Sequence, residues 1–447
     1  MKKLITLLLV LTGCVGTVSA ADLYISTDWV SSWWTTVRVY AYLSSDDSKN
    51  NGWAVSETGK ITSTTSRFGR NWYKFSMGTY DRAIVQRYDG TTIKDATSAI
   101  SMGDEDRYVL IYNDTYETSD GINRHGYDYR EAPACRDNGA HGWSVTASNM
   151  TVKDANTVTI DLSKDYVDAI ENTDIRFRIY NFNNELYPNT TGAKVGLPGS
   201  ITENISNGSS DNYFSIDKPA YDYHHITITA AYNTSSSSWS VSANAYIAKA
   251  ISSVGYATFG NKDVDVDFTG IDGLTAEKAK VNTSTGHITY KTATTLEAGE
   301  GALISGVEGT YYIPLAVAGD YADATNNDLY AVRETNTAFK GDANYHCYIL
   351  TNRIKDQVAD ADLGFYLVNE TDGNKVYLGS AYLRTPASGA YAPEFYPLFT
   401  DSETTDIKAI DNGQLTIDNS VYDLQGRRVM NPTKGLYIVN GKKVIIK

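Results

Sequence analysis

The sequence is poor in the residues that build disulfide frameworks and membrane spans. It has three cysteines in 447 residues, and only Cys135 and Cys347 lie beyond the first twenty residues. These two are far apart in the chain, which predicts free buried thiols rather than a disulfide bridge. After the first twenty residues no stretch is apolar enough to cross a bilayer, so the sequence predicts no transmembrane segment.

Catalytic signatures are missing as well. The sequence contains no G-x-S-x-G, H-E-x-x-H, Walker or dinucleotide-binding glycine pattern. This predicts a non-enzymatic chain without a cofactor or a metal centre. Two carboxylates from distant strands can form a glycoside hydrolase site, so a glycan-active enzyme stays open as an alternative. Segment 125–141 carries His125, Cys135 and His141, but their spacing fits no zinc pattern and predicts a polar loop between modules.

Positive charge and helical periodicity are both scarce. The formal charge is −14 at pH 7, which argues against nucleic acid and anionic lipid as partners. Tyrosine is abundant, with 34 copies. Short runs such as residues 37–43 and 175–181 alternate with the period of two that is typical of strands, and long helical periodicity is nearly absent. The sequence therefore predicts an all-β fold of tandem β-sandwich modules that ends in a small C-terminal β-hairpin domain.

Residues 1–20 have the pattern of an export signal. Two lysines precede a short apolar run, and a small-residue cleavage site ends at Ala20. Cleavage there leaves Ala21 as the first residue and predicts an extracellular or outer-membrane location. The alternative is a lipoprotein, because the end of the apolar run resembles a lipobox that would attach lipid at Cys14.

The first module, predicted at residues 21–141, is rich in aromatic side chains. All seven tryptophans of the chain lie before residue 240. Flat indole and phenol faces can cover the apolar C–H faces of sugar rings at little conformational cost. The alternative is that these rings fill the core and the contacts between modules. The candidate glycan platform consists of Trp29, Trp33, Trp34, Trp53, Trp72 and Tyr73.

The order of these aromatic residues carries a resemblance. A tryptophan-rich loop precedes the strand at residues 37–43, and a tryptophan turn and a strand at residues 72–77 follow. This order is loosely similar to small starch-binding modules. The second module, predicted at residues 142–249, ends in a hairpin at residues 225–243 that resembles modules of Bacteroidetes surface glycan-binding proteins. Both resemblances imply polysaccharide as a partner.

Residues 250–400 form a third predicted module. Its short motifs follow a distinctive order, from residues 256–259 through the run at 296–304 to the strands at 348–350 and 363–366. This order closely resembles a β-domain that stands before the sorting tail in many secreted Bacteroidales proteins. The resemblance implies a spacer and no chemistry.

The last predicted domain, residues 401–447, has the pattern of a sorting signal. Two β-prone runs, residues 436–439 and 443–446, flank Asn440-Gly441, which is a strong hairpin signal. The characteristic positions are Gly426, Arg427, Gly435, Tyr437, Gly441 and Lys447. In their order they resemble the C-terminal sorting domain of Bacteroidetes type IX secretion cargo. The resemblance implies recognition by outer-membrane secretion machinery and export to the cell surface.

Overall fold

The structure of this chain, a computed structural model, is built almost entirely of β-strands. Strands make up 59% of it and helix 2%, which confirms the predicted all-β class. Contacts divide the chain into two compact units, one ending at Ile247 and the other beginning at Ala248. The structure describes residues 21–447 except 31–35, 54–58, 89–91, 118–119, 139–146, 183, 187, 189–190, 203–211, 318–325, 353–362, 370, 388–392, 399–420, 423–427, 430–433, 440–441 and 447.

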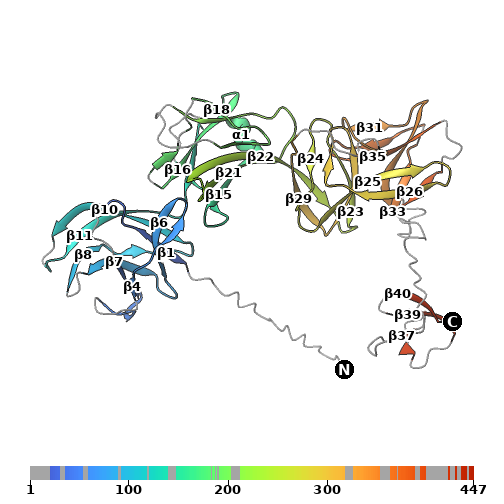
Figure 1. The fold of residues 1–447 in the computed structure, drawn as a ribbon. Helices are drawn as coiled ribbons and strands as arrows, with labels where there is room; N and C mark the ends of the chain where they lie inside the picture. The colour runs from blue at the N-terminus through green and yellow to red at the C-terminus, as the bar shows by residue number, and fades with distance from the viewer. Residues whose placement is uncertain are drawn as a thin grey trace, which may run out of the picture. The chain divides into compact units, whose positions relative to one another are not determined.

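The first module is a single sheet folded around one core (Figure 1, blue). Its order is β3-β2-β7-β8-β11-β10-β1-β6-β5, with β4 on β2 and β9 on β7. The strands are β1 (Asp22–Ser26), β2 (Val37–Leu43), β3 (Asp46–Asn50), β4 (Lys60–Ile61), β5 (Thr65–Arg67), β6 (Arg70–Ser76), β7 (Arg82–Tyr88), β8 (Ile93–Thr97), β9 (Ile100–Ser101), β10 (Arg107–Glu117) and β11 (Asn123–Arg130).

Period-two alternation places the core of this module. In β2, Val39 and Ala41 are buried, whereas Tyr40 and Tyr42 point to the other face and are half-buried. Strands β2 and β7 line the same apolar core as β1 and β10, which are separated from them by β8 and β11 in the sheet order. The sheet therefore curls until its two halves cover one core, which gives it the character of a sandwich.

The second module pairs two sheets, β13-β12-β16-β20-β18 with β17 on β16, and β14-β15-β21-β22-β19 (Figure 1, green). Its elements are β12 (Ala134–Asp137), β13 (Ser148–Asn149), β14 (Thr151–Val152), β15 (Thr157–Ser163), α1 (Lys164–Ala169), β16 (Asp174–Asn181), β17 (Asn184–Leu186), β18 (Ala193–Lys194), β19 (Gly199–Thr202), β20 (Phe214–Asp217), β21 (His225–Asn233) and β22 (Ser238–Ile251). Helix α1 begins where the Ser163 hydroxyl accepts a hydrogen bond from the Tyr166 amide.

The boundary between these modules differs from the prediction. Strand β12 pairs with β16 from Ala134 to Asp137, so it belongs to the second module. The first module ends with β11 at Arg130. The predicted boundary after residue 141 is therefore wrong, because the polar run that suggested a loop contains strand β12.

The second unit contains a sandwich of the sheets β23-β28-β25-β26 and β30-β35-β32-β33-β36. Side chains of both sheets, among them Leu303, Tyr348 and Phe365, form one buried core. The strands are β23 (Tyr256–Gly260), β24 (Val266–Asp267), β25 (Leu274–Asn282), β26 (His287–Thr292), β27 (Thr295–Leu296), β28 (Gly301–Gly306), β29 (Gly309–Pro314), β30 (Leu329–Ala331), β31 (Asn336–Phe339), β32 (Tyr345–Asn352), β33 (Leu363–Leu367), β34 (Asn374–Val376), β35 (Ala381–Pro386) and β36 (Phe395–Pro397).

Gly301 of β28 lies against β30 and β35 of the facing sheet, with no room for a side chain. A Cβ atom at Gly301 would lie 2.4 Å from the Cβ of Ala381 and 3.1 Å from Leu329. We therefore expect Gly301→Val to lower the free energy of unfolding of this unit by roughly 1–3 kcal/mol, as overpacked cores do. Calorimetric unfolding of residues 21–447 measures this loss. The matched control is Gly309→Val in the next strand, where the nearest atom would be 4.0 Å away; an equal loss there would contradict the packing argument.

The C-terminal sheet has the order β38-β37-β39-β40. Its strands are β37 (Val421–Tyr422), β38 (Arg428–Val429), β39 (Gly435–Val439) and β40 (Lys442–Ile446). Val439 pairs with Lys442, so β39 and β40 form the predicted hairpin across Asn440-Gly441. These two turn residues lie outside the described residues.

Candidate functional site

An exposed aromatic cluster lies on the outer face of β2. Tyr40 and Tyr42 stack at 5.3 Å between ring centroids with 23° between their planes. Trp53 meets Tyr40 edge-to-face at 4.7 Å and 78°. With 43% of its surface exposed, Trp53 is the most exposed of the described tryptophans. We call these three side chains the Tyr40–Trp53 cluster. It offers an indole to solvent, packed against the Tyr40 ring, which in turn stacks on Tyr42.

Polar groups surround this cluster. Partial burial raises the pKa of the Tyr40 hydroxyl, and the carboxylate of Asp47 raises it further. The phenol therefore keeps its proton and can donate a hydrogen bond, while the exposed carboxylate nearby can accept one. Arg38, two residues before Tyr40 in β2, is buried, and its guanidinium lies 4.6 Å from the ring centre of Tyr88. The accessible part of this face thus combines flat aromatic rings with the Tyr40 hydroxyl and the Asp47 carboxylate.

Trp29 stands in a turn after β1 and pairs with Tyr112 instead. The two rings stack at 5.5 Å and 15°, and Trp29 is half-buried. The preceding residue, Asp28, forms an ion pair with Arg70 at 3.0 Å, which ties the turn to β6. Trp29 therefore presents a second, partly covered indole at the rim of the same module. Trp33 and Trp34 lie outside the described residues.

Trp72 does not belong to an exposed surface, so its assignment to the platform is wrong, whereas Tyr73 is half-buried. Trp72 is 0% exposed, and its indole N–H donates to the Arg67 carbonyl at 3.0 Å. Tyr73 packs against the core of the first module. The physical reason is that neighbouring strand residues point to opposite faces. Trp72 faces Phe182 of the second module, whereas Tyr73 faces the core of its own module.

The far side of Trp72 is the contact between the first two modules. Its ring meets Phe182 of the second module edge-to-face at 4.9 Å, and Tyr108 lies at the same distance from Phe182. The backbone N–H of Phe68 donates to the Ala155 carbonyl, and the side-chain Nδ2 of Asn181 donates to the Phe68 carbonyl, both at 3.1 Å. Packed rings and reciprocal hydrogen bonds fix the two modules to each other. For Trp72, the alternative prediction that the aromatic rings fill contacts between modules is therefore confirmed.

The stretch 125–141, predicted as a polar loop, contributes to strands. His125 lies in β11, 3% exposed; its Nδ1 is 2.6 Å from the Tyr112 carbonyl and its Nε2 is 3.1 Å from Asp95. Asp95 is itself buried and bonded to Arg87 and Asn123. This network, with His125 and Asp95 buried at its centre, joins β7, β8, β10 and β11. The loop prediction is therefore wrong, because the polar residues satisfy one another inside the sheet.

Both described cysteines are free and buried, as the sequence predicts. Burial raises the pKa of the Cys347 thiol to about 11, and burial raises that of Cys135 even more. Neither is therefore a thiolate at neutral pH. Within the described part of the chain, no group of three or more His, Cys, Asp or Glu side chains is arranged to hold a metal ion.

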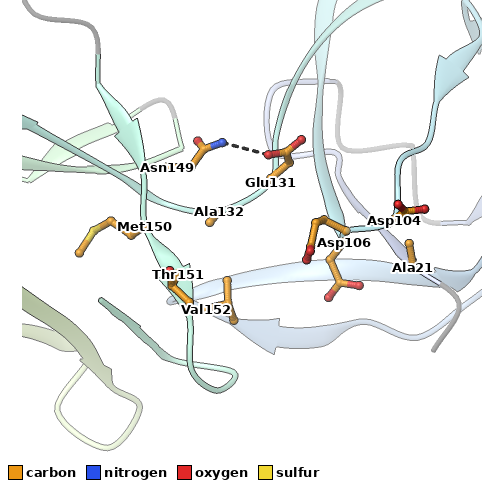
Figure 2. Close-up of a pocket in the computed structure, with 10 residues that line it drawn as sticks. Ala21, Asp104, Asp106, Glu131, Ala132, Asn149, Met150, Thr151 and Val152 are labelled. Atoms are coloured by element: carbon orange, nitrogen blue, oxygen red, sulfur yellow. Dashed lines mark hydrogen bonds between the residues drawn. The ribbon is translucent and has the colours of Figure 1, made fainter. Parts of the chain in front are cut away.

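A cavity of about 520 Å³ lies between the first and second modules. Figure 2 shows Asp104, Asp106 and Ala21 on the side of the first module, and Asn149, Thr151 and Val152 on the other. Glu131 accepts a hydrogen bond from Asn149 at 3.2 Å. We call this space the inter-module cavity. Its lining is Ala21, Asp104, Glu105, Asp106, Glu131, Ala132, Asn149, Met150, Thr151 and Val152.

The residues predicted for sorting are only partly placed. Gly435 begins β39, and Tyr437 lies in the middle of that strand and is half-buried. Gly426, Arg427, Gly441 and Lys447 lie outside the described residues. The structure therefore shows that the tail forms a sheet. Recognition of the tail by the secretion machinery stays a prediction.

Neither protein-family models nor curated proteins nor solved structures match this chain. Among the described residues, no helix combines the length and apolar character needed to cross a membrane. The function must therefore be argued from the surface of the molecule itself.

Proposed function

We propose that this chain is an exported, non-catalytic protein that binds polysaccharide through the Tyr40–Trp53 cluster. The observation that carries the proposal is the exposed indole of Trp53, held edge-to-face on Tyr40 with Tyr42 stacked beside it. Sugar rings have apolar C–H faces that cover such rings, and hydroxyl groups that need polar partners. The phenol of Tyr40 and the carboxylate of Asp47 supply a donor and an acceptor next to the indole.

Export is the second part of the proposal. The leader is removed after Ala20, and the C-terminal sheet is the segment that the outer-membrane secretion machinery recognises. The protein then acts at the outer-membrane surface or outside the cell. The support is the sequence at both ends of the chain, together with the paired strands β39 and β40 in the tail. The alternative is that the protein is exported as a lipoprotein with lipid attached at Cys14.

Affinity electrophoresis tests the binding function. Residues 21–447 are run through native gels that contain soluble starch, xylan or other glycans, beside gels without polysaccharide. We expect retardation on at least one polysaccharide, growing with its concentration. Normal mobility on every polysaccharide would remove the proposal.

The second candidate is a structural or adhesive surface protein without a defined ligand. It is favoured by the tryptophans that the structure uses for packing. Trp72 is buried at the contact between modules, and Trp239 is 4% exposed and packs edge-to-face on Tyr232. The Tyr232 ring in turn covers Gly69, where an added Cβ atom would lie 2.7 Å away. Under this alternative, loss of Trp53 changes nothing that the protein binds.

A further inference from the structure

The inter-module cavity contains the residue at which the predicted leader ends. Ala21 lines its wall, next to Asp104 and Asp106 (Figure 2). Ala21 is half-buried and stands directly before β1, in the middle of the first module's sheet. The backbone nitrogen at this position is therefore part of the folded module.

Hydrogen bonds fix the chain at this point. The Met77 amide donates to the Ala21 carbonyl at 3.2 Å. The Asp22 amide donates to Oδ1 of Asp106 at 2.9 Å, and the Asp22 side chain forms an ion pair with Lys74 at 2.6 Å. Residue 21 is thus held beside the loop that carries Asp104 and Glu105.

The charge of this wall is one-sided. Asp106 already accepts hydrogen bonds from the Asp22 amide and, at 3.2 Å, from Arg67. Asp104 and Glu105 are exposed carboxylates on the same wall. Among the described lining residues there is no lysine or arginine, so the charge of the wall is complementary to a cation.

Removal of the leader produces such a cation at this place. Water hydrolyses the Ala20–Ala21 peptide bond: the Ala20 carbonyl carbon takes the hydroxyl group, and the Ala21 nitrogen takes the hydrogen. The resulting amine then takes a proton from solvent at neutral pH. A neutral amide of the precursor thereby becomes an ammonium group with three N–H donors.

We propose that the α-ammonium group of Ala21, released by leader removal, binds Asp104 and Glu105 at the wall of the inter-module cavity. The cavity is thus a site for the chain's own processed N-terminus, and processing stabilises the first unit. The inference rests on the leader-removal part of the proposed function and is independent of glycan binding. In the precursor the same nitrogen is uncharged, so the precursor is the less stable form.

The test compares residues 21–447 with a free and with an acetylated α-amino group. The free form is released from a fusion protein by cutting before Ala21, and the acetylated form is made by enzymatic Nα-acetylation of the Ala21 amine. Acetylation removes the charge and leaves the rest of the chain unchanged. We expect it to lower the unfolding midpoint of the first unit by about 1–4 °C, as a surface ion pair worth up to roughly 1 kcal/mol would. In 1 M salt the difference should shrink, because screening weakens the pair.

Charge-neutral variants decide what the ammonium group binds. In the double variant Asp104→Asn with Glu105→Gln, acetylation should no longer change the midpoint. The matched control, Asp46→Asn with Asp47→Asn, removes one half-buried and one exposed carboxylate elsewhere in the same module and should keep the full effect. No effect of acetylation in the natural chain, or an equal effect in the Asp104/Glu105 variant, would overturn the proposal. N-terminal sequencing of the exported protein tests leader removal separately.

Discussion

Replacing Phe182 by alanine is expected to lower the free energy of unfolding of the first unit by roughly 3–5 kcal/mol, the usual cost of deleting a buried phenylalanine ring. Phe182 is 1% exposed, and its ring contacts Trp72, Tyr108 and Phe68, which all come from the other module. The loss therefore falls on the contact that unites the two modules. Since all seven tryptophans precede residue 240, tryptophan fluorescence of the full chain in urea follows this unit alone.

The shape of the urea unfolding transition shows more directly whether the two modules unfold as one unit. In the natural chain the two modules should unfold together in one fluorescence transition, because the rings and hydrogen bonds at their contact are lost together. In Phe182→Ala the transition should move to lower urea and broaden or split. Phe182→Leu, which keeps most of the apolar volume, serves as the control and should lose less. Two separate transitions already present in the natural chain would contradict a single cooperative unit.

Replacing Lys249 by methionine is expected to stabilise the second unit at neutral pH. Burial lowers the pKa of the Lys249 amine from 10.5 to about 8, and its Nζ donates to the Gly379 carbonyl at 2.8 Å. Holding this amine charged in the fold costs about 3 kcal/mol at pH 7, and methionine removes that cost. The lost hydrogen bond offsets about 1 kcal/mol, so the net gain in unfolding free energy is about 2 kcal/mol.

The sign of the pH dependence follows from the same shift. Between pH 8 and 10.5 the unfolded chain binds the Lys249 proton more strongly than the folded chain does, so stability rises with pH in that window. Calorimetry of residues 21–447 should show this rise in the natural chain relative to Lys249→Met. Tryptophan fluorescence of the first unit should not distinguish the two proteins. If the difference in unfolding free energy between the two proteins stayed constant from pH 7 to 10.5, it would contradict a buried Lys249 amine with a lowered pKa.

Local patterns in the sequence are sufficient for much of the fold. Period-two alternation predicts β2 at residues 37–43 and all of β16 (Asp174–Asn181) except its first residue, because one face of each strand is buried. The Asn440-Gly441 dipeptide predicts the hairpin of β39 and β40 for a similar local reason. These features depend on neighbours in the chain.

Features that depend on distant residues were not predictable in the same way. The polar residues around His125 look like a loop until Asp95 and Arg87, from other strands, satisfy them. Trp72 has the pattern of an exposed ring until Phe182 of the next module covers it. A single sequence contains no signal for either pairing, since the partners are more than 25 residues away.

The candidate site shows the same division. Trp53 was predicted as a platform residue from its type and its place in the first module. Its supports, Tyr40 and Tyr42, come from β2, and the turn that carries Trp53 returns over that strand. Residue type therefore indicates which kind of ligand the surface could bind. Which of the aromatic rings are exposed depends on the tertiary fold.

The most direct test of the account is the affinity of Trp53→Ala for the polysaccharide that retards the natural chain. Affinity electrophoresis of residues 21–447 should show a dissociation constant at least about tenfold higher, because a central tryptophan contributes roughly 2 kcal/mol to binding. Tyr377→Ala, which removes a 56% exposed ring from the second unit, should bind as the natural chain does. Unchanged retardation of a folded Trp53→Ala protein would contradict binding through the Tyr40–Trp53 cluster.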